Sequence, residues 1–267
     1  MAILTISREY GSGGMELGRM IAESLDYKYV DKDVILGDMK KFGEKWEQWG
    51  SDLDERRPSI WEKFDWSFRG FSALMKSIIL DYAERDNVVI MGRGGNFLLE
   101  GIPFAFRIRV VAALEARLKR IMERESMSKD TALWLVQKTD KDRTAFIRAL
   151  YGRAWAEPSQ YDKTYDTAGQ PLEVLLDVVR EEILRRDALR TEPAKSDLRM
   201  RALAAKVQAG IWMDRRFLVP TLEVEHDAEG LVLRGIVHSR KERQQLEEAA
   251  AALSGGVAVK SALHYRP

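Results

Sequence analysis

The sequence predicts an α/β fold in which a parallel sheet is flanked by helices, followed by a smaller α+β unit. Short apolar runs alternate with amphipathic helical patterns, which indicates parallel strands joined by helical crossovers. Two of the runs lead directly into glycine-rich turns, as strands that end at a ligand crevice do. After residue 190 the pattern changes to helix, strand, strand, helix and strand, which predicts a second unit.

The composition is that of a globular protein. Of the 267 residues, 45% are hydrophobic and 32% are charged, and the net charge of +1 gives no general attraction to nucleic acid. The absence of cysteine excludes disulfides, thiolate metal sites and cysteine nucleophiles. No apolar run is long enough to span a bilayer, and the N-terminus lacks the basic region of a secretory signal. We therefore expect a cytoplasmic protein with no nucleic-acid partner and no membrane span.

The first two elements enclose a glycine-rich turn. Residues 2–6 predict a buried strand and residues 15–25 predict a helix. Such a turn presents consecutive N–H groups at the positive end of a helix dipole, where an anion is stabilised. It therefore predicts a phosphate site, and the alternative is a turn that binds nothing. The candidate residues are Gly11, Ser12, Gly13, Gly14, Met15 and Glu16.

This turn lacks two parts of the usual phosphate loop, which ends in Gly-Lys-Ser/Thr. Met15 stands at the lysine position, Glu16 stands at the hydroxyl position, and Glu9 stands where the first glycine would be. The cation for the β- and γ-phosphates and the Mg²⁺-binding hydroxyl are therefore missing. On a helical wheel Met15 lies opposite the apolar stripe of its helix, which predicts that its side chain faces the site.

Polar residues follow the second strand, which is predicted at residues 27–30. Asp31 and Lys32 come directly after it, and residues beyond the carboxyl end of a parallel strand face the ligand crevice. Both are therefore candidates for contacting a second substrate. An equally good interpretation of Asp31 is that it caps a helix beginning near Val34.

Residues 40–85 predict a helical insertion rich in aromatic residues. It contains four of the seven tryptophans, and Pro58-Ser59 is predicted to begin a helix. Large apolar residues then recur at helical spacing as far as Ile79. This stripe is more typical of a core or a subunit contact than of a surface on which bases stack.

A second glycine-rich turn follows the third strand, which is predicted at residues 87–91. Arg93 lies in this turn, at the carboxyl end of the strand, where a guanidinium can bind a phosphate through two hydrogen bonds. The alternative is a solvated arginine on a surface turn. The next strand and helix are predicted at residues 104–111 and 114–124.

Residues 128–160 predict a basic helical arm that contains Arg143 and Arg148 and continues to Arg153. A mobile arm of this kind can close over a triphosphate and exclude water. The alternative is a solvated basic helix face. On a continuous helix Arg143 and Arg148 lie about 140° apart, so they meet one phosphate only if it sits between them or the helix breaks.

The sheet is predicted to end with a strand at residues 161–166 and a closing helix at residues 172–183. Beyond a boundary at residues 190–195, the small unit is predicted to begin with a helix at residues 196–213. Its strands are predicted at residues 221–225, 231–237 and 257–263, and a capping box at Ser239 opens its second helix. The domains are therefore expected at residues 1–190 and 195–267, and the second shows no acid/base or metal constellation.

Several motifs, in the same order along roughly residues 1–185, resemble those of the cytidylate kinase-like family. The motifs that carry the resemblance are residues 6–14, 29–33, 89–96, 140–143 and 155–162. The resemblance implies a P-loop nucleoside monophosphate kinase fold with a helical lid, with ATP and Mg²⁺ as co-substrates. It also implies that residues 11–14 bind donor phosphates, that Arg93 holds the acceptor phosphate, and that Arg143, Arg148 and Arg153 belong to the lid. Relatives of this type often carry arginine at the position of Met15.

Residues 195–267 are similar to a BON domain, and residues 231–237 carry most of that likeness. This implies a ligand-binding or oligomerisation module, so a homo-oligomer is expected through this unit or through the aromatic-rich insertion. The two resemblances together imply two alternative functions. The first is an ATP-dependent phosphotransferase that acts on CMP or a similar small phosphate acceptor. The second is a catalytically impaired nucleotide-binding sensor that signals through the BON-like domain.

Overall fold

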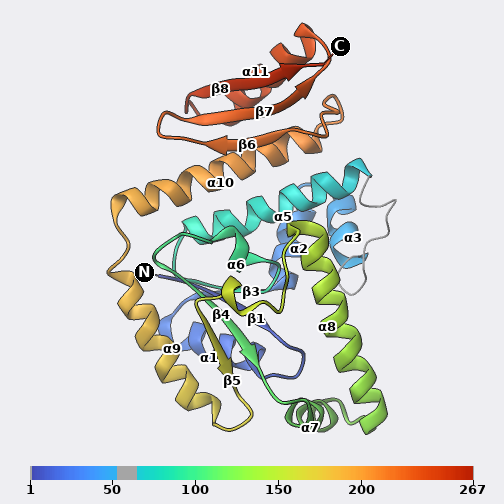
Figure 1. Cartoon of the computed structure of the whole chain (residues 1–267), viewed down its shortest axis with the longest axis vertical. Coiled ribbons are helices and arrows are strands. Elements are labelled where there is room, and N and C mark those ends of the chain that lie inside the picture. The colour runs from blue at the N-terminus through green and yellow to red at the C-terminus, as the bar shows by residue number, and fades with distance from the viewer. Residues whose placement is uncertain (1, 53–64, 267) are drawn as a thin grey trace.

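The computed structural model describes residues 2–52 and 65–266. Within them, five parallel strands form a sheet in the order β2-β3-β1-β4-β5 (Figure 1). These strands are β1 (Ile3–Arg8), β2 (Lys28–Val30), β3 (Val88–Met91), β4 (Ala105–Val111) and β5 (Lys163–Asp166). The predicted α/β fold with a parallel sheet flanked by helices is confirmed.

Alternate residues of the central strands enter two apolar cores on opposite faces of the sheet. Ile3 and Ile90 belong to one core, whereas Leu4 and Met91 belong to the other. Burial on both faces is what a parallel sheet requires, and it explains why every residue of β3 is apolar. The core with Leu4 is covered by α1 (Gly14–Leu25) and α9 (Leu172–Asp187).

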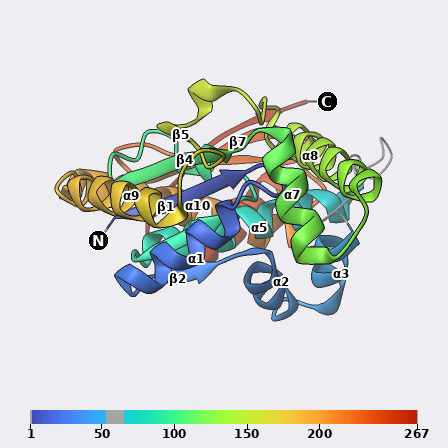
Figure 2. The same ribbon diagram turned by 90° about the horizontal axis from the view of Figure 1, so that it is seen from below.

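Several helices cover the opposite face, and they include the aromatic-rich insertion. They are α2 (Lys32–Lys40), α3 (Glu44–Asp52), α5 (Trp66–Glu84), α6 (Gly95–Leu98), α8 (Lys129–Tyr151) and the first half of α10 (Glu192–Met213). α2, α3 and α5 lie side by side (Figure 2). Phe68, Phe71 and Ile79 of α5 are buried, in agreement with the core interpretation of the aromatic stripe. The predicted helix start at Pro58-Ser59 lies outside the described residues.

The predicted basic arm is built mainly from α8, which packs near both of its ends. Near its start, Ala132 and Val136 pack on Leu118 of α7 (Leu114–Glu125). Near its end, Phe146 and Ile147 enter the core of the sheet. A short 3₁₀ turn (Pro158–Gln160) then leads to β5. α8 is therefore part of the packed body of the protein in this structure.

The C-terminal part contains a separate three-stranded sheet within the described residues. Its elements are α10, β6 (Glu223–His226), β7 (Leu231–Val237), α11 (Arg240–Leu253) and β8 (Val259–Tyr265), with strand order β6-β7-β8. The predicted α-β-β-α-β order is thus observed. The first helix of this unit starts earlier than expected, because Thr191 caps α10 by accepting the N–H of Ala194.

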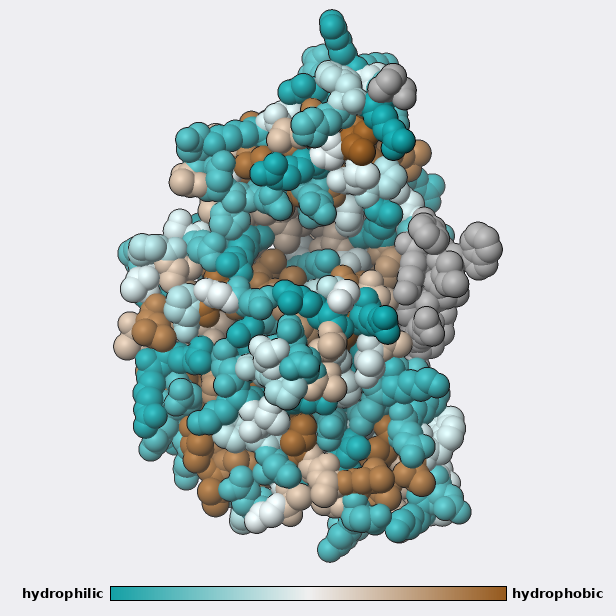
Figure 3. All heavy atoms as spheres, in the orientation of Figure 1, coloured by the Kyte–Doolittle hydropathy of each residue, from teal (hydrophilic) through white to brown (hydrophobic). Residues whose placement is uncertain are grey.

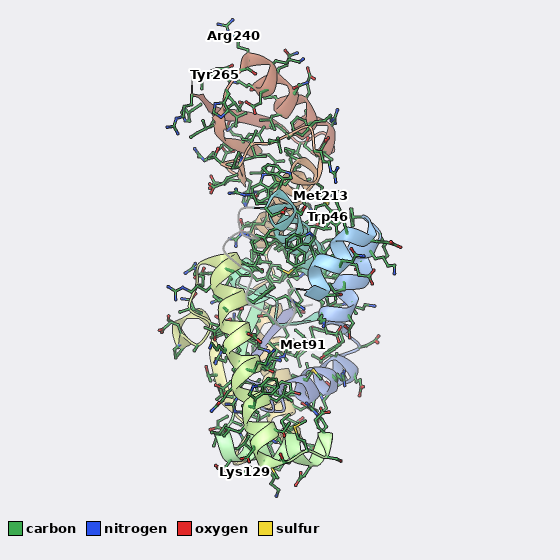
Figure 4. The ribbon with its side chains drawn as sticks, turned by 90° about the vertical axis from the view of Figure 1, so that its right-hand side faces the viewer. Trp46, Met91, Lys129, Met213, Arg240 and Tyr265 are labelled. Atoms are coloured by element: carbon green, nitrogen blue, oxygen red, sulfur yellow. The ribbon has the colours of Figure 1, made fainter. Side chains whose placement is uncertain are left out.

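α10 joins the two parts. Leu198 and Ala202 lie in the core of the large sheet, whereas Val207 and Ile211 lie in the C-terminal core. The helix runs beside α5 (Figure 1), and its last residue, Met213, packs with Trp46 in the core of the large sheet (Figure 4). The predicted boundary at residues 190–195 therefore overlaps the start of a helix that both cores share.

The visible surface is mostly hydrophilic, with apolar residues scattered among polar ones (Figure 3). Of the helices in residues 2–52 and 65–266, none combines the length and the apolar character that crossing a bilayer requires.

Candidate functional site

The turn between β1 and α1 lines a cavity of about 450 Å³. Gly11 and Gly13 adopt φ angles of +78° and +79°, which glycine tolerates without a Cβ penalty. The N–H of Ser12 is bonded to the carbonyl of Glu9 at 3.2 Å. The other N–H groups of the turn and of the start of α1 have no acceptor among the described residues. They belong to Gly11, Gly13, Gly14, Met15 and Glu16. These donors and the helix dipole make the turn suitable for an anion.

Met15 has two environments. It lines the loop cavity, but it is also partly buried and packs, as Leu172 and Leu176 of α9 do, against the core that α1 and α9 cover. The helical-wheel prediction therefore holds only in part, because the wheel of α1 does not include the neighbouring helix. Glu16 also lines the cavity, and its carboxylate pairs with Arg124 at 3.4 Å.

Glu9, at the position where a phosphate loop normally has glycine, fixes the start of the loop. Its carboxylate lies 3.4 Å from Nη2 of Arg109 and 3.7 Å from Nε of Arg117, and it accepts the N–H of Ala112 at 3.4 Å. Arg109 is only 4% exposed, so its charge needs this anion. The same guanidinium lies over the Trp155 ring, 4.3 Å from its centroid. Glu9 thus connects the loop to the carboxyl end of β4.

Thr167 and Arg120, which lie outside the predicted site residues, hold the other side of the loop. The Thr167 hydroxyl donates to the carbonyl of Ser12 at 2.5 Å. Arg120 donates to the Thr167 hydroxyl at 2.8 Å and to the carbonyl of Gly11 at 3.4 Å. Thr167 follows the last strand of the sheet directly, and this position was the only sequence signal that could have found it.

A second cavity, of about 170 Å³, lies beside the glycine turn that follows β3. Arg93 lines it, as do Lys32 and Asn96. The Arg93 guanidinium lies 5.0 Å from the centroid of the Phe146 ring, and the Arg93 carbonyl accepts the Tyr151 hydroxyl at 2.7 Å. The turn predicted from the sequence therefore presents a cation to a concave site.

Tyr151 holds this turn from behind. Burial raises the pKa of its hydroxyl, so it remains a proton donor to the Arg93 carbonyl throughout the physiological range. Its ring packs 5.4 Å from that of Phe97, and the ammonium of Lys76 lies 5.2 Å from its centroid. Burial lowers the pKa of Lys76.

The two cavities meet at three shared residues, which are Arg8, Tyr10 and Arg143. Nη1 of Arg143 donates to the carbonyl of Arg8 at 2.9 Å, and its guanidinium lies 5.6 Å from the Tyr10 ring centroid. A phosphate chain bound in the loop cavity and a phosphate held beside Arg93 would approach each other at this junction.

Residues 140–143, one of the motifs similar to the cytidylate kinase-like family, attach α8 to the loop. Oδ1 of Asp140 accepts the N–H of Tyr10 at 2.9 Å, and Oδ2 accepts Arg117 at 2.5 Å. Asp142 lines the second cavity and pairs with Lys138 at 3.0 Å. The helix is therefore connected to both cavities through neighbouring side chains.

Three of the predicted site residues lie elsewhere. Asp31 caps α2 by accepting the N–H groups of Asp33 at 3.1 Å and Val34 at 3.3 Å, and it lines neither cavity. Because α8 is continuous, Arg148 is exposed and lines neither cavity. Arg153 follows the helix and pairs with Glu100 at 2.7 Å. The ligand-binding roles expected for these residues stay predictions.

The loop cavity offers few metal ligands from the protein itself. Within the described ranges, no group of three or more histidine, cysteine, aspartate or glutamate residues could hold a metal ion. The carboxylates of Glu16 and Glu123 do line the cavity. Mg²⁺ commonly binds through substrate phosphates, one or two carboxylates and water, so this set fits an ion that arrives with a triphosphate.

Comparison with known sequences covers the large sheet and the site. The sequence model of the Cytidylate kinase-like family matches residues 3–168. The cytidylate kinase of Methanocaldococcus jannaschii is 27% identical over 183 residues, which are 68% of this chain and 97% of that protein. The cytidylate kinase of Methanosarcina mazei is 28% identical over 179 residues, which are 66% of this chain and 93% of that protein.

A solved structure shares the fold. The crystal structure of an uncharacterized protein from Eubacterium ventriosum aligns with a TM-score of 0.55 at 22% identity. The alignment covers 68% of this chain and 98% of that one.

Proposed function

Because the chain belongs to the cytidylate kinase-like family, we propose that it is an ATP-dependent phosphotransferase that acts on a nucleoside monophosphate, with CMP as the first candidate. The observation that carries this proposal is the junction of the two cavities at Arg8, Tyr10 and Arg143. A kinase of this type needs the donor and acceptor phosphates held in line and in contact, and cations that stabilise the transferred charge.

The site residues have the following roles in the proposed reaction. N–H groups of the loop and the start of α1 bind the donor phosphates, and Mg²⁺ enters with ATP to neutralise part of their charge. Arg93 and Lys32 hold the acceptor phosphate. One of its oxygens attacks the γ-phosphorus in line, and the bond to the β–γ bridging oxygen breaks to release ADP. Arg143 stabilises the charge that develops between them.

A turnover assay with an acceptor panel tests the proposal. We expect ADP release that depends on CMP when the protein is mixed with ATP and Mg²⁺, with weaker release for UMP, AMP and GMP. A reaction without acceptor controls for simple ATP hydrolysis. Nucleotide binding by calorimetry without acceptor-dependent ADP release would contradict the kinase proposal.

Met15 gives a second prediction at the same site. We expect Met15→Lys to tighten binding of ATP with Mg²⁺ by about tenfold, because a charge-assisted hydrogen bond contributes about 1.5 kcal/mol or more. Met15→Leu, which keeps the apolar contacts with α9, should leave the affinity unchanged. Calorimetry measures both. If the lysine variant binds no more tightly, the side chain at position 15 does not reach the phosphates.

Met15 and α10 also support a second candidate, a nucleotide sensor with impaired catalysis. The loop lacks its lysine, and α10 contacts both the core beneath the site and the core of the C-terminal unit. In this case the C-terminal unit, proposed to be a BON-like ligand-binding module, would report nucleotide occupancy. The same assay separates the two candidates, because a sensor binds nucleotide without turnover.

A further inference from the structure

The missing loop lysine raises the question of which cation bridges the donor and acceptor phosphates. Several cations line one cavity each. Arg120 and Arg124 line the loop cavity, whereas Arg93 and Lys32 line the second cavity. Among the described residues, the cations that line both are Arg8 and Arg143.

Arg8 is the last residue of β1, so it enters the junction from the strand side of the loop. Two glycines make room for its side chain. A Cβ atom at Gly14 would lie 2.6 Å from Cβ of Arg8, closer than real Cβ contacts, and 3.3 Å from Cγ of Arg8, which is a tight contact. A Cβ atom at Gly92 would collide with Nη1 of Arg8. The stem of Arg8 therefore lies against the start of α1, and its guanidinium lies against the turn that carries Arg93.

Neighbouring contacts fix the backbone at Arg8. Its backbone carbonyl is bonded to Arg143, and the next residue, Glu9, is fixed by Arg109 and Arg117. The side chain of Arg8 thus extends from Gly14, the first residue of α1, to Gly92 in the turn that carries Arg93. The lysine of an ordinary loop would reach the phosphates from the start of α1.

We propose that Arg8 is a catalytic residue that replaces the absent loop lysine, with its guanidinium bound at once to the terminal phosphate of the donor and the phosphate of the acceptor. This inference rests on the proposed phosphotransferase function. The planar guanidinium has five N–H donors, so one group can bind oxygens of both phosphates. It offsets their repulsion before transfer and stabilises the charge on the moving phosphoryl group during transfer.

The first test is kinetic and compares three variants of the full chain. Arg8→Met is expected to lower kcat for ATP-dependent CMP phosphorylation by about 100-fold. Arg8→Lys, which keeps the charge, is expected to recover part of the loss. Arg185→Met, which removes an exposed arginine paired with Glu181 and Glu182 on α9, should match the wild type. A kcat for Arg8→Met within threefold of the wild type would overturn the inference.

The second test does not need turnover. Calorimetry would compare ADP with adenosine–cytidine pentaphosphate, a single molecule that spans the donor and acceptor sites. We expect Arg8→Met to bind ADP normally, which shows that the loop is intact, and to lose about 100-fold of the preference for the pentaphosphate. A preference equal to that of the wild type would reject the role of Arg8. Absence of CMP phosphorylation by the wild type would instead reject the proposed reaction, and the binding preference then decides on Arg8.

Discussion

Replacement of Arg143 by methionine is expected to lower kcat/KM for phosphate transfer by about 10²–10³-fold, the usual loss when one group that stabilises transition-state charge is removed. Arg143 lines both cavities and is held by the carbonyl of Arg8 at 2.9 Å. Asp140 lies 3.8 Å from the same guanidinium, so its position is fixed from two sides. Most of the loss should appear in kcat, because the charge that Arg143 neutralises develops during transfer.

Arg148 provides the comparison on the same helix. It lies five residues from Arg143 on a continuous α8, is exposed, and lines neither cavity. Arg148→Met is expected to change kcat/KM by less than about threefold, since a solvated arginine contributes little. Steady-state assays with ATP and CMP measure both variants. If Arg148→Met is as damaging as Arg143→Met, the phosphates bind elsewhere along α8.

Replacement of Gly94 by alanine is expected to destabilise the protein by about 2–5 kcal/mol and to raise KM for the acceptor. The left-handed conformation at φ +76° costs about 1–2 kcal/mol for a residue with Cβ. In addition, the new Cβ would overlap the ring of Tyr151, and overpacking typically costs about 1–3 kcal/mol. Displacement of Tyr151 would release the carbonyl of Arg93 and so disturb the acceptor site.

Gly101→Ala separates the two contributions. Gly101 has a similar φ of +81°, but the nearest atom to its new Cβ would be Nη2 of Arg201 at 3.7 Å. This variant should lose only about 1–2 kcal/mol of unfolding free energy, which is the cost of the left-handed conformation, and it should keep the wild-type KM for the acceptor. Urea unfolding and acceptor titration compare the two. Equal losses of stability in both variants would show that the contact with Tyr151 is not decisive.

The local features of the fold could be predicted from the sequence because they depend on neighbours in the chain. Every residue of β3 is apolar and most of β1 is apolar, and the turns after β1 and β3 are marked by glycines that adopt positive φ. Half of the capping box predicted at Ser239 is observed: Glu242 donates its N–H to the Ser239 hydroxyl at 3.1 Å, whereas the Glu242 carboxylate accepts the N–H of His238 at 2.7 Å. The position of Arg93 beside a cavity could be predicted for the same reason, because Arg93 lies inside one of these turns.

The shape of the site could not be predicted, since it depends on residues far apart in the sequence. Asp140 bonds to Tyr10 across 130 positions, and Thr167 bonds to Ser12 across 155. The place of Arg8 between the two cavities could not be predicted either, because in the sequence it is the polar end of a strand, and Gly14 and Gly92 come close to it only in the fold. These contacts are specified by tertiary packing, which no local pattern contains.

Because α10 belongs to both cores, it also couples the unfolding of the two parts of the protein. Leu198 and Ala202 of α10 are as much a part of the large core as the residues of α5 beside them. Removal of the chain from residue 192 onward would expose the side of α5 that packs on α10. Removal of the C-terminal sheet alone would expose Val207 and Ile211 of α10. We therefore expect the two halves to melt in a single cooperative transition, and a change at the C-terminal sheet to be felt by the helices that pack behind the turn carrying Arg93.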